Sequence, residues 1–337
     1  MLRRIGDVIL TTPAARALRK LFPQARIDFL TEPPSDEALA GNPDLSRVLR
    51  YAPEPGEGAA ASYLRWLRRI RAERYDWVVD YMGNPRSAIL TFASGAGLRA
   101  GPAHVWHRWA YNRLLRQSPE ACYAGLEKIR VLRSLGLEPD ASDFLPRLHL
   151  TEEAKGAAAR ALAGLWPDGA GPLVGLVPAS RKETRRWPAA SYAALARLLA
   201  ERADARALVF WGPGERELAE QVAQGAGPGA RAAPRTASLT ELAALLSRCQ
   251  AVVTNCNGPK HLAVACGVPT VTIHGSSDPA SWNPPDPRHL VVRLEELHCI
   301  GCALNECPYG LECMTGLSPE LVAGRTLEVL GLSAARR

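Results

Sequence analysis

The hydrophobic positions along the chain alternate between short apolar runs and longer stretches with helical spacing. Short apolar runs predict strands at 25–32, 75–81, 172–180, 206–212, 251–255 and 269–275. Amphipathic stretches predict helices at 13–22, 124–136, 188–203, 215–225, 238–249 and 259–266. Strands and helices in alternation predict an α/β fold, in which helices cover parallel sheets.

A helical stretch followed by chain breakers separates the two halves of this pattern. Residues 152–165 have helical character, and the next stretch, WPDGAGP, is rich in glycine and proline. At 337 residues the chain is about twice the usual domain length. We therefore predict an N-terminal domain at 1–164 and a C-terminal domain at 165–337, with a cysteine-rich insertion at 298–313 and a final helix that begins near Ser318.

Composition and charge narrow the classes of protein. Apolar residues make up 47% and charged residues 22%, which are proportions of a folded protein and exclude disorder, collagen and coiled coil. Residues 1–150 hold 22 basic and 16 acidic side chains, against 19 and 18 in the rest, so most of the net charge of +7 lies in the first half. No basic stripe with interleaved aromatic residues is visible, so we expect no nucleic acid and instead an anionic partner for the first domain.

The chemical state expected of the cysteines depends on the cellular compartment of the protein. The chain has no run of about eighteen apolar residues and no signal-peptide core, so we expect a cytoplasmic protein with reduced or metal-bound cysteines. Four cysteines have the spacing C-x2-C-x4-C-x5-C: Cys299, Cys302, Cys307 and Cys313. Such a group could hold zinc or an iron–sulfur cluster, and redox-labile disulfides are an alternative.

The loop Arg3–Asp7 precedes the predicted helix at 13–22. If this loop lies at the carboxyl edge of a sheet, it would face a ligand. Asp7 is its candidate for chemistry, and capping of the turn is the structural alternative. Only two residues precede this loop, whereas a strand needs about five. We expect that translation starts upstream and that the first strand is absent from this sequence; the alternative is that Asp7–Leu10 forms it.

The loop after the predicted strand at 172–180 is strongly basic. It holds four cations and two hydroxyl groups, among them Ser180 and Lys182. These side chains are suited to phosphates, although a solvated basic loop would have the same composition.

Two more loops follow predicted strands. After 251–255, Gly258 and Pro259 open a helix whose free N–H groups could bind a diphosphate. Lys260 and His261 lie in its first turn, where cations are disfavoured unless an anion binds; a half-buried structural histidine is the alternative. After 206–212, Glu215 could accept hydrogen bonds from ribose hydroxyls or simply compensate the helix dipole.

Together these segments resemble glycosyltransferase family 9, the lipopolysaccharide heptosyltransferases and their relatives. The resemblance is carried by IGDVILTTPAARALRKLFPQARIDFLT, GPGERELAE, NGPKHLAVACGVPTVTIHGSSDPASWNPP and, as in some members, CIGCALNECPYGLECM. It implies the GT-B architecture of two Rossmann-like domains, whose parallel sheets face a central cleft, with the acceptor on the first domain and the nucleotide sugar on the second.

The resemblance also implies roles. Asp7 matches the catalytic carboxylate of an inverting, metal-independent transferase, and Arg3 and Arg4 would contact the acceptor. The donor-binding residues would be Ser180, Lys182, Glu215, Asn257, Gly258, Pro259 and His261. The implied donor is ADP-heptose and the implied acceptor is the anionic lipopolysaccharide core, reached by peripheral contact with the inner membrane; no cofactor and no metal are expected.

One departure bears on specificity. Many family members have Asp-Ser or Asp-Thr before Gly-Pro, whereas this chain has Cys256-Asn257, so one polar contact to the donor is altered. Alternatives are a family 9 transferase for another nucleotide sugar and a GT-B nucleotide-sugar epimerase. From another class, the chain could be a metal-binding module that uses its four-cysteine tail.

Overall fold

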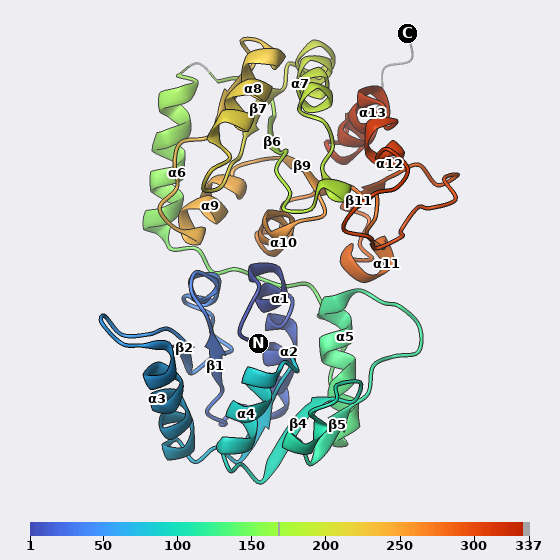
Figure 1. The fold of residues 1–337 in the computed structure, drawn as a ribbon. Helices are drawn as coiled ribbons and strands as arrows, with labels where there is room; N and C mark the ends of the chain where they lie inside the picture. The colour runs from blue at the N-terminus through green and yellow to red at the C-terminus, as the bar shows by residue number, and fades with distance from the viewer. Residues whose placement is uncertain (168, 333–337) are drawn as a thin grey trace. The chain divides into compact units, whose positions relative to one another are not determined.

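The computed structural model describes residues 1–167 and 169–332. The chain divides into two compact units, Met1–His149 and Leu150–Arg337 (Figure 1). Both units are α/β, as the sequence predicts, and all the strand pairs are parallel.

The division between the units lies earlier than the sequence predicts. Helix α6 (Glu152–Leu165) begins at the Thr151 N-cap, whose hydroxyl accepts the N–H of Ala154, and it falls in the second unit rather than at the end of the first. α6 belongs to the second unit because it packs against helix α9 (Leu239–Leu246) of that unit.

The second unit is built on one six-stranded parallel sheet. Its strands are β6 (Leu173–Val177), β7 (Arg206–Val209), β8 (Ala230–Ala232), β9 (Ala251–Asn255), β10 (Thr270–Ile273) and β11 (His289–Val292). They lie in the order β11-β10-β9-β6-β7-β8, so the order reverses between β6 and β9. Every residue of these two central strands is buried, as expected for a parallel sheet with helices on both faces.

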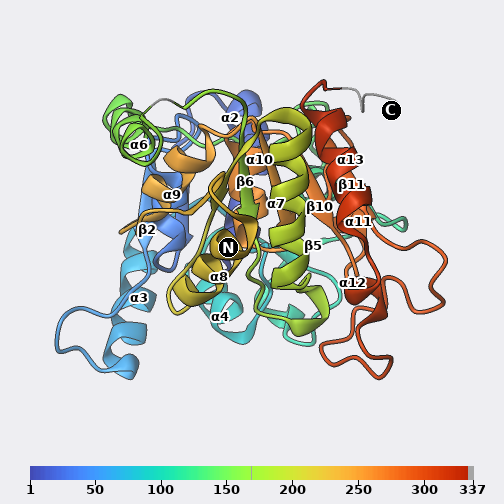
Figure 2. The same ribbon diagram turned by 90° about the horizontal axis from the view of Figure 1, so that it is seen from above.

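Helices cover this sheet. They are α7 (Ala189–Ala203), α8 (Arg216–Ala226), α10 (Gly258–Ala265), α11 (Pro279–Trp282), α12 (Glu312–Thr315), α13 (Pro319–Val329) and the 3-10 turn η4 (Glu183–Arg185). Helix α7 contacts both α8 and α13, and Figure 2 shows them in front of the sheet. The predicted helices of this half are confirmed, each to within about three residues at its ends.

The first unit contains two separate parallel sheets. The strands are β1 (Asp28–Thr31) with β2 (Arg47–Arg50), and β3 (Trp77–Val79) with β4 (Leu98–Pro102) and β5 (Arg113–Leu115). β1 pairs with β2, and β4 lies between β3 and β5. β1 and β3 are not paired with each other, so no continuous sheet runs from β2 to β5.

The first helix of this unit begins close to the start of the chain, at Ile5. They are α1 (Ile5–Ile9), α2 (Thr12–Leu21), α3 (Ala59–Ala72), α4 (Pro85–Ala93), α5 (Ala124–Arg130) and the 3-10 turns η1 (Ser35–Leu39), η2 (Arg108–Ala110) and η3 (Val131–Leu135). The alternative that Asp7–Leu10 forms a strand is wrong. That segment closes helical hydrogen bonds, with the N–H of Val8 donating to Arg4 and that of Leu10 donating to Gly6.

Candidate functional site

The loops after β6 and β9 emerge from neighbouring strands at the point where the strand order of the second unit reverses. Open α/β sheets bind ligands at this switch point, outside the carboxyl ends of the strands. The first loop runs through 178–188 and the second through 256–258. The predicted donor residues Ser180, Lys182 and Asn257 therefore come from adjacent positions in the sheet.

Two asparagines join these loops. The side-chain amide of Asn257 donates to the carbonyl of Ala179 at 2.9 Å, and that of Asn255 donates to Pro178 at 2.8 Å. The Oδ1 atom of Asn255 in turn accepts the N–H of Trp187 at 3.1 Å. These hydrogen bonds fix the backbones of the two loops relative to each other.

The N-terminus of α10 offers fewer free donors than the sequence suggested. Asn257 is the N-cap, and its Oδ1 atom accepts the N–H of Lys260 at 3.1 Å. Pro259 has no N–H, so Gly258 supplies the first-turn amide that is left for an anion.

The cation in this first turn has a structural explanation. Lys260 is completely buried, and its ammonium group donates to the carbonyl of Trp282. Burial lowers the pKa of Lys260 to about 8. The position of Lys260 in the first turn of α10 is therefore explained without a bound anion, contrary to the sequence-based interpretation.

Two buried histidines lie beside this lysine. His261 follows Lys260, and its ring packs edge-on to Trp282 with centroids 6.2 Å apart. His274 follows β10, and its Nδ1 atom lies 3.0 Å from the hydroxyl of Ser277. Burial, with the charge of Lys260 as a further cause, lowers the pKa of His261 well below its usual range and that of His274 to about 3.

Both imidazole rings are uncharged, and their hydrogen-bonding capacity is only partly used. In the described part of the chain, Nδ1 of His261 and Nε2 of His274 are buried without a hydrogen-bond partner. The sequence identified His261 but missed His274. The available signal for His274 was its position at the carboxyl end of a predicted strand, where α/β folds hold ligands.

The loop after β6 concentrates positive charge. Burial and the neighbouring guanidinium groups of Arg185 and Arg181 lower the pKa of Lys182. Within the described residues none of these three cations has an acidic partner within 4 Å, and Nε of Arg185 is buried without a partner. The carbonyl of the buried Ser180 accepts from Arg186 at 2.7 Å. The loop is electrostatically suited to an anion.

Glu215 lies one strand further along the sheet, at the turn between β7 and α8. One carboxylate oxygen, Oε2, accepts the N–H of Gly212 at 2.9 Å. The side chain thus stabilises its own turn through Oε2, and Oε1 is the oxygen that could accept from a ribose hydroxyl.

The predicted catalytic carboxylate lies in the first turn of α1. Asp7 is half-buried; burial raises the pKa of its carboxyl group and the charge of Lys128 opposes this rise. Lys128 comes from α5, where burial lowers its own pKa and the carboxylates of Asp7 and Asp80 oppose that change. A carboxylate and an ammonium group thus influence each other where acid–base chemistry is expected.

Lys128 was not predicted, because the sequence around it indicates only a helix. Arg3 and Arg4, predicted to contact the acceptor, are exposed. The backbone N–H of Arg4 lies 3.4 Å from Oδ2 of Asp7. The structure thus places these two guanidinium groups in solvent near the start of α1.

The cysteine-rich segment is attached to the donor loops. The N–H groups of Gly301 and Ala303 donate to Gly275 and Ser276 at 3.0 and 2.7 Å, and the hydroxyl of Thr184 donates to Leu304 at 2.9 Å. All eight cysteines are free thiols. Among residues 1–167 and 169–332, no group of three or more His, Cys, Asp or Glu side chains is arranged to hold a metal ion.

Within those same ranges no helix combines the length and the apolar character that crossing a bilayer requires.

Comparison with known proteins adds to this geometry. The family model described as glycosyltransferase family 9 (heptosyltransferase) matches residues 63–311. Lipopolysaccharide heptosyltransferase 1 of Pseudomonas aeruginosa is 28% identical over 320 residues, covering 90% of this chain and 85% of the relative.

Solved structures resemble this chain over nearly its whole length. The family 9 glycosyl transferase of Veillonella parvula has a TM-score of 0.85 at 24% identity, covering 99% of this chain and 96% of the other. The Escherichia coli heptosyltransferase WaaC with ADP-2-deoxy-2-fluoro heptose has a TM-score of 0.70 at 23% identity, with 97% of each chain covered. These likenesses confirm the predicted α/β class and GT-B architecture.

Proposed function

Since the chain belongs to glycosyltransferase family 9, we propose that it transfers heptose from ADP-heptose to the lipopolysaccharide core, with inversion at the anomeric carbon and without a metal. Two of the named relatives support this choice of substrates: one is a lipopolysaccharide heptosyltransferase, and another was solved with an ADP-heptose analogue. The observation that carries the proposal is the unpaired cationic loop beside the α10 N-terminus at the switch point of the second unit.

The donor diphosphate is assigned to that switch point. Lys182 supplies a point charge, Ser180 a hydroxyl donor and Gly258 a backbone N–H. As the bond between the anomeric carbon and the diphosphate oxygen breaks, negative charge develops on the leaving ADP. Fixed donors stabilise that charge without reorganisation, because the asparagine bridges hold the loops in place.

Further roles at the donor are assigned by position. His261, neutral and with a free ring nitrogen, can exchange a hydrogen bond with the sugar or phosphate. Pro259 shapes the helix start, and Glu215 retains one oxygen for a ribose hydroxyl.

Asp7 is assigned the role of general base. The acceptor hydroxyl attacks the anomeric carbon from the side opposite the diphosphate and its proton passes to the Asp7 carboxylate. Burial raises the pKa of that carboxyl group, which strengthens it as a base, while the charge of Lys128 opposes this rise. Arg3 and Arg4, exposed beside α1, are assigned to anionic groups of the acceptor, whose lipid would bring the enzyme to the membrane surface.

The test is ADP release and glycolipid product formation with ADP-heptose and a truncated acceptor, for the unaltered chain and for Asp7→Asn. We expect a loss of about a hundredfold or more in kcat for Asp7→Asn, with donor binding retained. Asp140→Asn is the matched control, since Asp140 is an exposed acid of the same unit that pairs with Lys20. Unchanged turnover in Asp7→Asn would remove Asp7 as the base, and donor turnover without acceptor would favour an epimerase.

A further inference from the structure

Two tryptophans of the first unit face solvent. Trp106 is 80% exposed and Trp109 is 55% exposed, and both lie in the connection between β4 and β5. His107 and Ala110, which follow them directly, are buried. Side chains three positions apart share one side of a 3-10 turn, and η2 lies here. The connection therefore directs His107 and Ala110 inward and the two tryptophans outward.

The inward side chains hold this connection in place. The ring nitrogen Nε2 of His107 donates to the carbonyl of Gly83 in the loop after β3. Ala110 packs with Ala88 of α4 and with Tyr111 in one buried cluster. The tryptophans are thus presented to solvent by an anchored segment of the chain.

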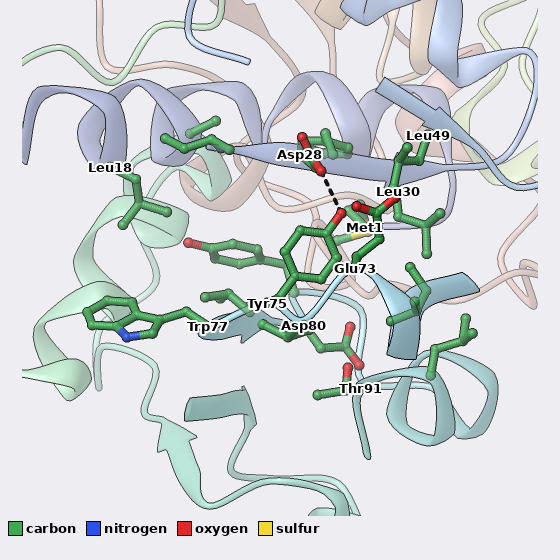
Figure 3. A pocket seen from close by; sticks show the side chains of 18 of the residues that line it. Met1, Leu18, Asp28, Leu30, Leu49, Glu73, Tyr75, Trp77, Asp80 and Thr91 are labelled. Atoms are coloured by element: carbon green, nitrogen blue, oxygen red, sulfur yellow. Dashed lines mark hydrogen bonds between the residues drawn. The ribbon is translucent and has the colours of Figure 1, made fainter. Parts of the chain in front are cut away.

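Helix α4 extends this exposed apolar surface. Ile89 and Phe92 lie three residues apart on its outer face, and Phe92 is 51% exposed. The rings of Phe92 and Trp109 pack edge to face with their centroids 5.4 Å apart. On the inner side of the same helix, Thr91 lines a cavity within the unit (Figure 3). We call the exposed group Ile89, Phe92, Trp106 and Trp109 the aromatic patch.

The charge around the aromatic patch has one sign. Residues 81–119 include five arginines and neither Asp nor Glu. The guanidinium group of Arg99 lies over the ring of Phe92, 5.7 Å from its centroid, and Arg108 is exposed beside Trp109. Among the residues that the structure describes, neither Arg99 nor Arg108 forms an ion pair with an acidic side chain. Exposed aromatic rings thus occur together with uncompensated positive charge.

A bilayer that contains anionic lipids fits both properties. Tryptophan is enriched at membrane–water interfaces, because its ring is apolar and its N–H is polar. Arginine is attracted by the negative surface potential and binds phosphate groups. A second copy of the chain fits less well, because a two-fold contact through this patch would bring the Arg99 and Arg108 side chains of both copies together.

We propose that the aromatic patch is a membrane-docking surface, which places its aromatic rings in the headgroup layer of an anionic bilayer and Arg99 and Arg108 on lipid phosphates. In the proposed function, the lipid of the acceptor brings the enzyme to the membrane. The aromatic patch adds a contact with the bilayer itself, formed by α4 and the connection between β4 and β5. This contact requires neither donor nor acceptor, so it can be measured on the chain alone.

The first test is cosedimentation of the full chain with vesicles of phosphatidylethanolamine and phosphatidylglycerol, compared with vesicles of phosphatidylcholine. We expect the double variant Trp106→Ser/Trp109→Ser to bind the anionic vesicles about tenfold or more weakly than the unaltered chain. The control is Leu64→Ser/Tyr309→Ser, which removes two exposed apolar side chains outside the patch and should leave binding unchanged. Equal binding of the two double variants, or equal binding of the unaltered chain to both kinds of vesicle, overturns the proposal.

The second test changes charge and keeps the tryptophans. We expect Arg108→Gln to weaken binding to the anionic vesicles by about threefold or more and to make it less dependent on salt, because a contact with lipid phosphate is lost. Arg133→Gln is the control, since it removes an exposed arginine of η3 in the same unit, and it should have a smaller effect. Equal losses in both variants would show that net charge attracts the chain to the bilayer, and would overturn the proposal.

Two further measurements separate this proposal from its alternatives. Sedimentation velocity tests for a second copy: an oligomer that is lost in Trp106→Ser/Trp109→Ser, with vesicle binding unchanged, overturns the proposal. Heptosyl transfer to a deacylated acceptor in solution should be the same for this variant and the unaltered chain, because the patch contains none of the residues assigned to donor or acceptor. A chain that binds anionic vesicles through the patch but transfers no heptose would contradict the proposed function alone.

Discussion

The side chain of Asn257 donates a 2.9 Å hydrogen bond to the carbonyl of Ala179 and at the same time caps helix α10 through the N–H of Lys260. One side chain therefore joins the loop after β6 to the loop after β9 and fixes the start of the helix between β9 and β10. This double role gives a way to separate helix stability from donor binding.

Asn257→Asp retains the cap but loses the donor N–H. We expect ADP affinity to fall by about tenfold, because a carboxylate oxygen then faces the Ala179 carbonyl and adds negative charge beside the diphosphate. Calorimetric titration with ADP measures this change. Ser318→Ala removes the cap of α13, a bond of 3.2 Å to Leu321, and should cost about 1 kcal/mol of stability without affecting ADP. Equal ADP affinity in both variants would contradict the assigned role.

Lys182→Met tests the cationic loop. We expect ADP binding to weaken by about tenfold and its dependence on salt to become shallower, because a charged contact with phosphate is lost. Titrations at low and high ionic strength measure both effects. Lys155→Met is the control, since Lys155 is an α6 lysine that pairs with Glu152 at 2.8 Å; a similar loss in both variants would indicate a nonspecific charge effect.

Lys128→Met tests the setting of the Asp7 pKa. The charge of Lys128 lowers that pKa against the effect of burial, so its removal should raise the pKa further. Since the base must be ionised, the acid limb of the kcat/KM profile should move to higher pH. The pH profile of Lys128→Arg, which keeps the charge, should lie close to that of the unaltered chain. Coincident profiles for Met and Arg would exclude this coupling.

Gly275→Ala tests the attachment of the cysteine-rich segment. A Cβ atom at this position would lie 2.6 Å from Sδ of Met314 and 2.9 Å from Sγ of Cys313. We expect a loss of about 1–3 kcal/mol in thermal unfolding from overpacking. Gly324→Ala, in α13 with open space around the added atom, should instead stabilise by about 0.5–1 kcal/mol. Equal melting temperatures would show that the segment moves aside freely.

Much of the fold was predictable because its signals are local. β6 and β9 are continuous apolar runs, and the Thr151 and Ser318 caps mark helix starts in the sequence. Strands such as β4, which contains Gly101 and Pro102, have no such pattern, since their place in the sheet is fixed by pairing with neighbours.

The candidate site was predictable in part for the same reason. Ser180, Lys182 and Asn257 stand directly after strong strand patterns, so their arrival at one sheet edge follows from parallel topology. Lys128 and His274 could not be assigned roles, because their importance comes from which charges and rings lie around them in space.

By itself, the sequence determined the parallel α/β class and the order of the candidate loops along the chain. The tertiary structure decided that Lys260 donates to a carbonyl rather than to an anion, that α6 belongs to the second unit, and that the first unit has two separate parallel sheets. The physical reason is range: strand and helix patterns are set by neighbours in the chain, whereas burial, charge pairing and strand pairing depend on residues that only folding brings together.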